Sequence, residues 1–260
     1  MPRVASETGN AERYTPGDMA SAVAVMADRR VETHGRFFLP HLRPGQAVLD
    51  VGCGPGTITV GLAAAVAPGP VLGVDAGAHQ LDQGRRLAAQ VGMTNVAFEA
   101  ASCYELPWPD QSVDRVFSHA LLEHLVDPVA ALREARRVLR PGGMIGVCSP
   151  DWGGFLLTPP SDGVAAALLA YQDVQRGNGG DPLAGRKLGV HLGEAGFADI
   201  RVDARYERFT STTAMAELLA VLLDEAGHGD HARSVRMWSD QSCGTMFAEA
   251  WVSAVAVNST

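Results

Sequence analysis

The sequence has few of the features that mark secreted, membrane-spanning or nucleic-acid-binding proteins. Its 4 cysteines include no C-x-x-C pair, which argues against a disulfide framework and against a structural zinc site. A formal net charge of −8 gives no basic surface for a phosphate backbone, so we expect no nucleic-acid partner. The longest apolar runs, such as residues 60–67, are too short to cross a bilayer.

Further absences narrow the class of protein. Residues 1–7 lack the apolar core of a signal peptide, and with the cysteine usage this predicts a cytoplasmic protein without a membrane partner. His228 and His231 stand three apart in a Gly/Asp-rich segment, which favours a solvated loop over a metal site. With 260 residues, 47% of them hydrophobic and none in repeats, the chain can bury one substantial core with a small cap.

What the sequence does contain is a glycine-rich turn framed by two acids. An apolar run at residues 48–51 leads into Gly52-Cys53-Gly54-Pro55-Gly56, and a second apolar run at residues 71–74 ends at Asp75. This is the layout of a nucleoside-binding βαβ unit, in which glycines let the backbone approach the ligand and the second acid binds ribose hydroxyls.

The earlier acid, Asp50, indicates the kind of nucleoside. A dinucleotide site offers amide donors and a helix N-terminus to a pyrophosphate, which a neighbouring carboxylate would repel. Thr57 also stands where the G-x-G-x-x-G pattern requires its third glycine. Asp50 instead suits a cation, such as the amino group of a methionine moiety.

Strand-like and helix-like apolar patterns alternate along the chain. We expect strands at residues 47–51, 71–75, 96–99, 113–118, 144–148, 200–206 and 251–257. We expect helices at residues 18 to about 39, 57–66, 79–91, 128–139, near 164–175 and 183–194, and two within 213–237, with a Gly/Pro-rich loop at 151–160. This alternation predicts an α/β fold with a parallel sheet, helices on both faces, and ligands at the carboxyl ends of the strands.

Five motifs occur in an order that is typical of one enzyme family. They lie at residues 50–56, 74–75, 106–114, 139–143 and 194–197. With them the sequence resembles the class I S-adenosylmethionine-dependent methyltransferases, in particular the small-molecule group that includes the quinone-ring methylases. The resemblance implies a Rossmann-like, seven-stranded, mostly parallel sheet with helices on both faces. It also implies an N-terminal helical lid at residues 1–44, a cofactor-binding core at 45–150, and a remainder at 151–260 with helical cap insertions and the last two strands.

The resemblance also implies which residues bind S-adenosylmethionine. These are Tyr14, Asp50, Gly52, Cys53, Gly54, Gly56, Asp75, Ala76, Gln80, Ser102, Cys103 and His119. Asp50 would lie near the ammonium of the cofactor, and Asp75 would take both ribose hydroxyls. Ser102, which is followed by Cys103, stands where many relatives place an acid against the adenine amino group, which is a departure from the family pattern. Tyr14 would belong to the lid over the cofactor.

Two histidines are the candidate catalytic residues. The resemblance places the end of the strand at 113–118 beside the sulfonium, so His119 is a candidate base, because the ordinary pKa of histidine suits proton removal near neutrality. The alternative is that only the backbone of His119 lines the cofactor. His124 is the second candidate for contact with the substrate, although in relatives the Glu123-His124 pair is usually structural.

The reaction that the resemblance implies is in-line methyl transfer, which depends chiefly on alignment and exclusion of water. Apolar and aromatic residues within 1–40, 151–180 and 210–246 favour a small apolar or aromatic substrate of secondary-metabolite type. Three alternatives stay open: a quinone-biosynthesis methylase, a cofactor sensor without turnover, and a cyclase or isomerase on the same fold. Beyond the small-molecule substrate, a homodimer is left open as a partner, and no metal is expected.

Overall fold

The computed structural model describes residues 12–15, 26, 28–209, 211–240 and 244–259. One seven-stranded sheet in the order β3-β2-β1-β4-β5-β7-β6 forms its centre, and β7 runs antiparallel to both neighbours while the other pairs are parallel. The strands are β1 (Val48–Val51), β2 (Val71–Asp75), β3 (Val96–Ala100), β4 (Val113–His119), β5 (Leu139–Thr158), β6 (Ala198–Arg208) and β7 (Met246–Val257). The predicted mostly parallel, seven-stranded sheet is confirmed.

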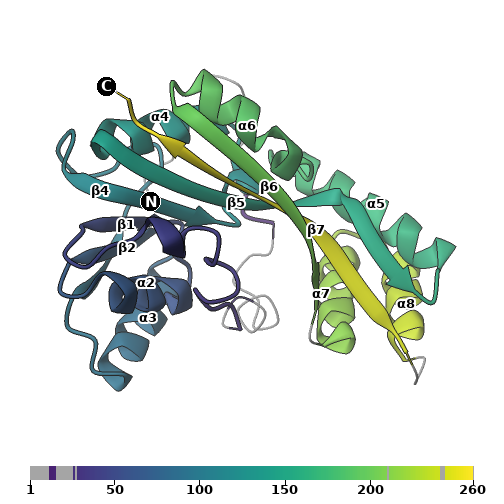
Figure 1. Ribbon diagram of the computed structural model, residues 1–260. Coiled ribbons are helices and arrows are strands. Elements are labelled where there is room, and N and C mark those ends of the chain that lie inside the picture. Colours follow the sequence, from purple (N-terminus) through teal and green to yellow (C-terminus); the bar gives the residue numbers. More distant parts are fainter. Residues whose placement is uncertain (1–11, 16–25, 27, 210, 241–243, 260) are drawn as a thin grey trace.

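Helices cover both faces of the sheet, as the alternating pattern predicted. The helices are α2 (Thr57–Val66), α3 (Ala78–Gln90), α4 (Pro128–Val138), α5 (Asp162–Gly177), α6 (Ala184–Glu194), α7 (Thr212–Glu225) and α8 (Gly229–Ser239), with 3-10 turns η1 (Leu39–His41) and η2 (Leu122–His124). In Figure 1, α2 and α3 lie below the strands and α4 and α6 lie above them. None of the helices in the described ranges is long and apolar enough to cross a membrane.

Local signals explain where these helices begin and which side they bury. Asp127 caps α4 by accepting a hydrogen bond from the backbone N–H of Ala130, and Pro128 occupies the first turn, where no N–H is needed. The buried side chains of α4 recur at helical spacing: Ala131, Leu132, Ala135 and Val138. They pack with α6 and with β1, β4 and β5 in the core above the sheet.

The expected loop at residues 151–160 is wrong, because β5 continues as a strand to Thr158. Its far half, from Phe155 to Thr158, pairs with residues 246–249 of β7, and the register is irregular between Asp151 and Phe155. Gly153 and Gly154 fall in this irregularity, where a bulge absorbs residues that leave the ladder. The far ends of β5 and β7 carry α5, α7 and α8, which share a second core (Figure 1).

The expected helix over residues 18 to 39 is only partly open to comparison, since 18–25 and 27 lie outside the described residues. Within its described part Met26 is helical, but the expectation is wrong for residues 28–38, which form turns and bends that lead into η1. Phe38 is fully buried there, against Phe117 of β4, and Gly146 makes room for it because a Cβ would lie 2.4 Å from the Phe38 ring. Tertiary burial of this ring overrides the helical spacing.

Candidate active site

The glycine-rich turn after β1 adopts a backbone that favours glycine. Gly52, Gly54 and Gly56 have φ values of 74°, 52° and 75°, a region in which other residues are strained. A Cβ on Gly56 would lie 2.6 Å from the Phe98 ring, and one on Gly52 would lie 3.1 Å from Leu121. The turn is therefore held close to β3 on one side and to the segment after β4 on the other.

Asp75, at the end of β2, is attached to this turn. Its carboxylate accepts hydrogen bonds from the backbone N–H of Gly54 at 2.9 Å and from that of Gly77 at 2.8 Å. Ala76 follows it on the exposed side, and Gln80 is buried with its Oε1 3.1 Å from where a Cβ of Gly54 would be. The structure thus brings both acids and the glycines of the predicted site together at the carboxyl ends of β1 and β2.

Asp50 lies buried beneath the turn. Thr59 of α2 donates a hydrogen bond of 2.6 Å to its carboxylate. Burial raises the pKa of Asp50 to about 7, and the nearby charge of Asp75 adds to this effect. Burial, together with these two acids, also raises the pKa of the Cys53 thiol well above its ordinary value. A cation at the turn would relieve this concentration of buried negative charge.

Ser102 and Cys103 lie in the loop that follows β3, next to Asp75. The N–H of Ala101 donates to the backbone carbonyl of Asp75 at 3.2 Å, while the Ser102 hydroxyl accepts a hydrogen bond from the N–H of Tyr104 at 3.2 Å. Burial raises the pKa of Cys103 to about 12. The same loop is tied to the N-terminal segment, because the Tyr104 hydroxyl donates to Glu12 at 2.7 Å.

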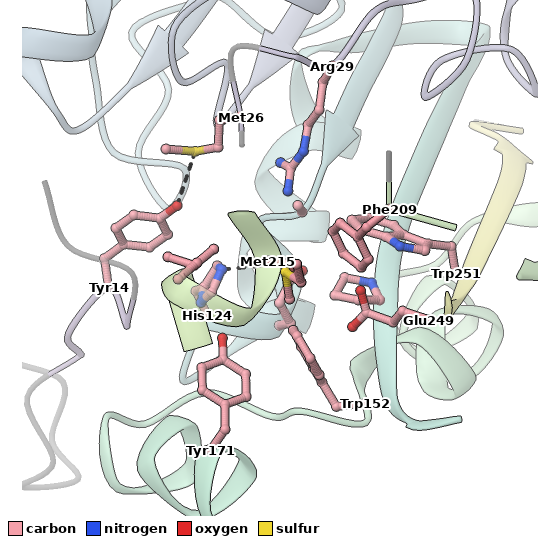
Figure 2. Close-up of a pocket in the computed structure, with 14 residues that line it drawn as sticks. Tyr14, Met26, Arg29, His124, Trp152, Tyr171, Phe209, Met215, Glu249 and Trp251 are labelled. Carbon is pink, nitrogen blue, oxygen red and sulfur yellow. Dashed lines mark hydrogen bonds and ion pairs between the residues drawn. The ribbon is translucent and has the colours of Figure 1, made fainter. Parts of the chain in front are cut away.

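A pocket opens beside this turn, between η2 and the helices on the far half of the sheet. It is lined by Tyr14, Met26, Arg29, Ala120, Glu123, His124, Pro150, Trp152, Tyr171, Phe209, Met215, Leu218, Glu249 and Trp251. Figure 2 shows aromatic rings around its walls. Met26 connects it with the turn, since its sulfur lies 3.9 Å from where a Cβ of Gly54 would be and accepts a hydrogen bond from Tyr14 at 3.3 Å.

The two candidate histidines occupy different places. His124 lines the pocket with its ring edge-on to Tyr14, 4.7 Å between centroids, and its Nδ1 has no hydrogen-bond partner among the described residues. Burial lowers its pKa to about 3, with a smaller effect from the positive charge of Arg29. His119 instead lies behind the pocket wall, with its ring stacked on Trp251 at 4.8 Å, and burial lowers its pKa well below the ordinary value.

Two buried acids line the pocket: Glu123, which the sequence analysis named only as part of a pair that is usually structural, and Glu249, which it missed. Glu123 is 2% exposed and accepts a hydrogen bond of 2.9 Å from the Ser149 hydroxyl; burial raises its pKa to about 7. Glu249 is 1% exposed, and its Oε1 has no hydrogen-bond partner in the described part of the chain. Burial, with the charge of Glu123 added, raises the pKa of Glu249 well above its ordinary value. An acid on the same face of β7 as Phe247 and Trp251 was the available sequence signal.

Comparisons with known proteins agree with this architecture. A profile of the methyltransferase domain family matches residues 42–176. An uncharacterized methyltransferase of Schizosaccharomyces pombe is 32% identical over 92% of this chain and 88% of that protein. The 27-O-demethylrifamycin SV methyltransferase of Amycolatopsis mediterranei is 34% identical over 62% of this chain and 57% of that protein. An uncharacterized 37.1 kDa transposon protein of Streptomyces fradiae is 33% identical over 84% of this chain, which spans 64% of that relative.

Solved structures with little sequence identity share the fold. The YcgJ protein of Bacillus subtilis matches with a TM-score of 0.62 at 16% identity, covering 85% of this chain and 96% of that chain. The 4+2 cyclase SpnF matches with a TM-score of 0.53 at 21% identity, covering 90% of this chain and 79% of that chain. At such identities the matches establish the fold alone.

Proposed function

Because the chain belongs to the methyltransferase domain family, we propose that it transfers the methyl group of S-adenosylmethionine to a small molecule with an apolar or aromatic body. One observation carries this proposal. The glycine-rich turn with its buried acid Asp50 and the attached Asp75 adjoins an aromatic-lined pocket, to which Met26 connects it. A donor in the turn would direct its sulfonium toward an acceptor in the pocket.

The residues of the turn fit the donor by charge and by space. Asp50 would receive the ammonium of the methionine part beneath Gly52, Gly54 and Gly56, where side chains would block the approach. Asp75 would accept the ribose hydroxyls, and its hydrogen bonds to the turn hold it in place. Ala76, Gln80, Ser102 and Cys103 would surround the adenosine, and Tyr14 would cover the site from the N-terminal segment.

S-adenosylmethionine supplies a methyl group on a positively charged sulfur, and transfer discharges that sulfur. The protein's contribution is to align the acceptor and to exclude water, both of which the aromatic pocket favours. We assign His124 to the pocket wall, where its neutral ring can accept a hydrogen bond through Nδ1. We assign His119 to supporting Trp251 from behind, because its ring stacks on that side chain.

The rival function is a cyclase or isomerase on the same fold, since SpnF is a cyclase in its printed name and shares this architecture. The relative from Amycolatopsis mediterranei is named for methylation of an oxygen, which supports a secondary-metabolite acceptor here. We also propose that residues 1–44, 45–150 and 151–260 act as lid, donor-binding core and cap. A cytoplasmic location and a homodimer remain predictions, and size-exclusion chromatography tests the latter.

The test is mass spectrometry of reactions containing the protein, S-adenosylmethionine and a panel of phenols, indoles, amines and quinone precursors. We expect S-adenosylhomocysteine together with a product heavier by one methyl group. A rearranged product without S-adenosylhomocysteine would favour the cyclase. Donor binding without any turnover across the panel would favour a sensor, and no donor binding would contradict the proposal.

A further inference from the structure

The pocket combines aromatic walls with two buried acids, neither of which forms an ion pair with a Lys or Arg side chain in the described part of the chain. Glu249 forms no ion pair within the described ranges, and Glu123 has only the neutral ring of His124, 3.7 Å from its Oε1. Both side chains are almost fully buried. A buried carboxylate without a counter-charge is costly, and a ligand that brings a positive charge removes that cost.

Glu249 lines the pocket, and its Oε1 has no hydrogen-bond partner among the described residues. Figure 2 shows its carboxyl group among the rings of Phe209, Trp251 and Trp152, and the pocket-lining atoms include all of them. Aromatic faces carry partial negative charge and attract cations. The walls and the acids therefore favour the same kind of ligand group, a positively charged one.

The one cation among the described lining residues does not reverse this preference. The guanidinium of Arg29 lies over the Trp251 ring, 5.6 Å from its centroid; its charge lowers the pKa of Glu123 and of Glu249, but burial has the larger and opposite effect on both. An anionic ligand would meet Glu123 and Glu249 in the same pocket and would add to their repulsion. A neutral hydroxyl could satisfy the free oxygen of Glu249, but only a cation would also favour the ionised form of this acid, whose pKa burial raises.

The two acids reach the pocket from different elements. Glu123 lies in η2, two residues after Leu121, whose side chain contacts Gly52 of the donor-binding turn. Glu249 lies on β7. Glu123 is thus the acid nearer to the proposed methyl donor, while Glu249 is placed to hold the body of the acceptor.

We propose that the methyl acceptor is an amine that enters as its ammonium, carried on an apolar or aromatic body, and that it is held by Glu249 and the aromatic walls while Glu123 takes its proton. This inference rests on the proposed methyl transfer and names its substrate class. The ammonium gives one proton to the carboxylate of Glu123, which frees the nitrogen lone pair. The N–C bond forms as the S–C bond breaks, the S–C electron pair goes to sulfur, and the new ammonium and a neutral thioether result.

Three ligands of similar shape test the inference: phenethylamine, 2-phenylethanol and 3-phenylpropanoate. Each is titrated by calorimetry into the full-length protein saturated with S-adenosylhomocysteine. We expect phenethylamine to bind at least about tenfold more tightly than 2-phenylethanol, and 3-phenylpropanoate to bind most weakly. Equal affinities, tighter binding of the alcohol or the acid, or no binding of the amine would overturn the inference.

A charge-removing variant assigns the preference to the pocket. Glu249→Gln should lower the affinity for phenethylamine at least about tenfold and leave that for 2-phenylethanol unchanged, whereas Glu99→Gln, at an exposed position on β3, should change neither. A preference that survives Glu249→Gln would overturn the role of Glu249. If that variant does not fold, the comparison of the three ligands on the wild-type protein still decides.

Saturating the protein with S-adenosylhomocysteine before each titration tests the proposed methyl transfer separately from the proposed substrate class. If S-adenosylhomocysteine does not bind, the proposed methyl transfer fails, whatever the amine does. If it binds and the amine is not preferred, only the substrate class fails.

Discussion

At the residue scale, Asp75 has acceptor capacity beyond the bonds that hold the turn. It accepts one N–H from Gly54 and one from Gly77, while a carboxylate offers about four lone-pair sites. We expect Asp75→Ala to weaken binding of S-adenosylmethionine at least about tenfold, because charge-assisted hydrogen bonds contribute roughly 1.5–3 kcal/mol each. Calorimetry measures the change. Asp75→Asn keeps the shape of the side chain, so its affinity for S-adenosylmethionine should lie between those of the wild type and of Asp75→Ala. Unchanged affinity in the alanine variant would contradict the cofactor assignment.

Glu123 should make stability depend on pH. Burial raises its pKa in the folded protein from 4.5 to about 7, so between these values the folded state holds a proton that the unfolded state has lost. Stability must then fall as pH rises through this window and level off above it. Between pH 5 and pH 7.5 the free energy of unfolding should fall less in Glu123→Gln than in the wild type. The two falls should differ by about a few kcal/mol.

Urea unfolding at several pH values measures this difference. Asp50 and Glu249 also have raised pKa values and contribute the same sign, so the variant should keep part of the dependence. Parallel curves for wild type and variant would show that Glu123 is ionised in the folded protein and would contradict the raised pKa.

Candidate site residues that lie close together in the sequence were predictable. Those that only the pairing of distant strands brings together were not. Glycine spacing and the flanking acids specify the turn within one βαβ unit, so the roles proposed for Asp50 and Asp75 could be predicted without tertiary information. Glu249 and Glu123 meet because β7 returns antiparallel beside β5, a pairing that no local pattern encodes. Which of the proposed residues touch donor or acceptor stays a prediction.

At the scale of elements, a glycine inside α3 tests how tightly this helix packs on the sheet. Alanine normally stabilises a helix relative to glycine by up to about 1 kcal/mol. At Gly84, however, a Cβ would lie 2.7 Å from the Phe98 ring, whereas at Gly177, in the last turn of α5, nothing lies within 4 Å. We expect Gly84→Ala to destabilise by roughly 1–3 kcal/mol through overpacking and Gly177→Ala to be neutral or stabilising. Chemical denaturation compares the pair, and a stabilising Gly84→Ala would refute the close packing.

Helix and strand positions in the core followed from apolar spacing, because each of these elements buries one face or one stripe. The secondary-structure predictions failed where contacts with residues distant in the sequence determine the local conformation. Phe155 to Thr158 form a strand because β7 supplies their hydrogen-bond partners, despite the glycines before them. Residues 28–38 form turns because Phe38 is buried under Phe117 and Gly146, despite their helical spacing.

At the scale of the whole molecule, one ion pair connects the irregular part of β5 with α6. Asp151 is 4% exposed and accepts hydrogen bonds from Nε and Nη2 of Arg186, both at 2.7 Å, and from the N–H groups of Gly153 and Arg186 at 3.1 Å. The next residue, Trp152, lines the pocket. This pair therefore fixes a pocket wall from outside the pocket.

We expect Asp151→Ala to destabilise the protein by roughly 1–3 kcal/mol, because it leaves backbone donors unpaired. It should weaken binding of the acceptor while the affinity for S-adenosylmethionine stays the same, since the turn proposed to bind the donor lies elsewhere. Asp173→Ala is the control, because its exposed pair with Arg176 should contribute less than about 1 kcal/mol. Thermal unfolding measures the change in stability, and calorimetric titrations with the donor and with the acceptor measure the two affinities. Equal losses of both affinities would contradict the inference that Asp151 acts only on the pocket wall.

The continuity of β5 and β7 bears on how such a protein acquires new substrates. The pairing runs from Met144 and Val257, in the half that contains the glycine-rich turn, to Thr158 and Met246, in the half that carries α5, α7 and α8. Separating the two halves would break the hydrogen bonds between β5 and β7. The protein therefore cannot open as two domains about a hinge. Changes of acceptor must then arise by exchange of side chains on a fixed scaffold. Mutational diversity is best directed at the inward faces of α5 and α7, leaving the donor-binding half untouched.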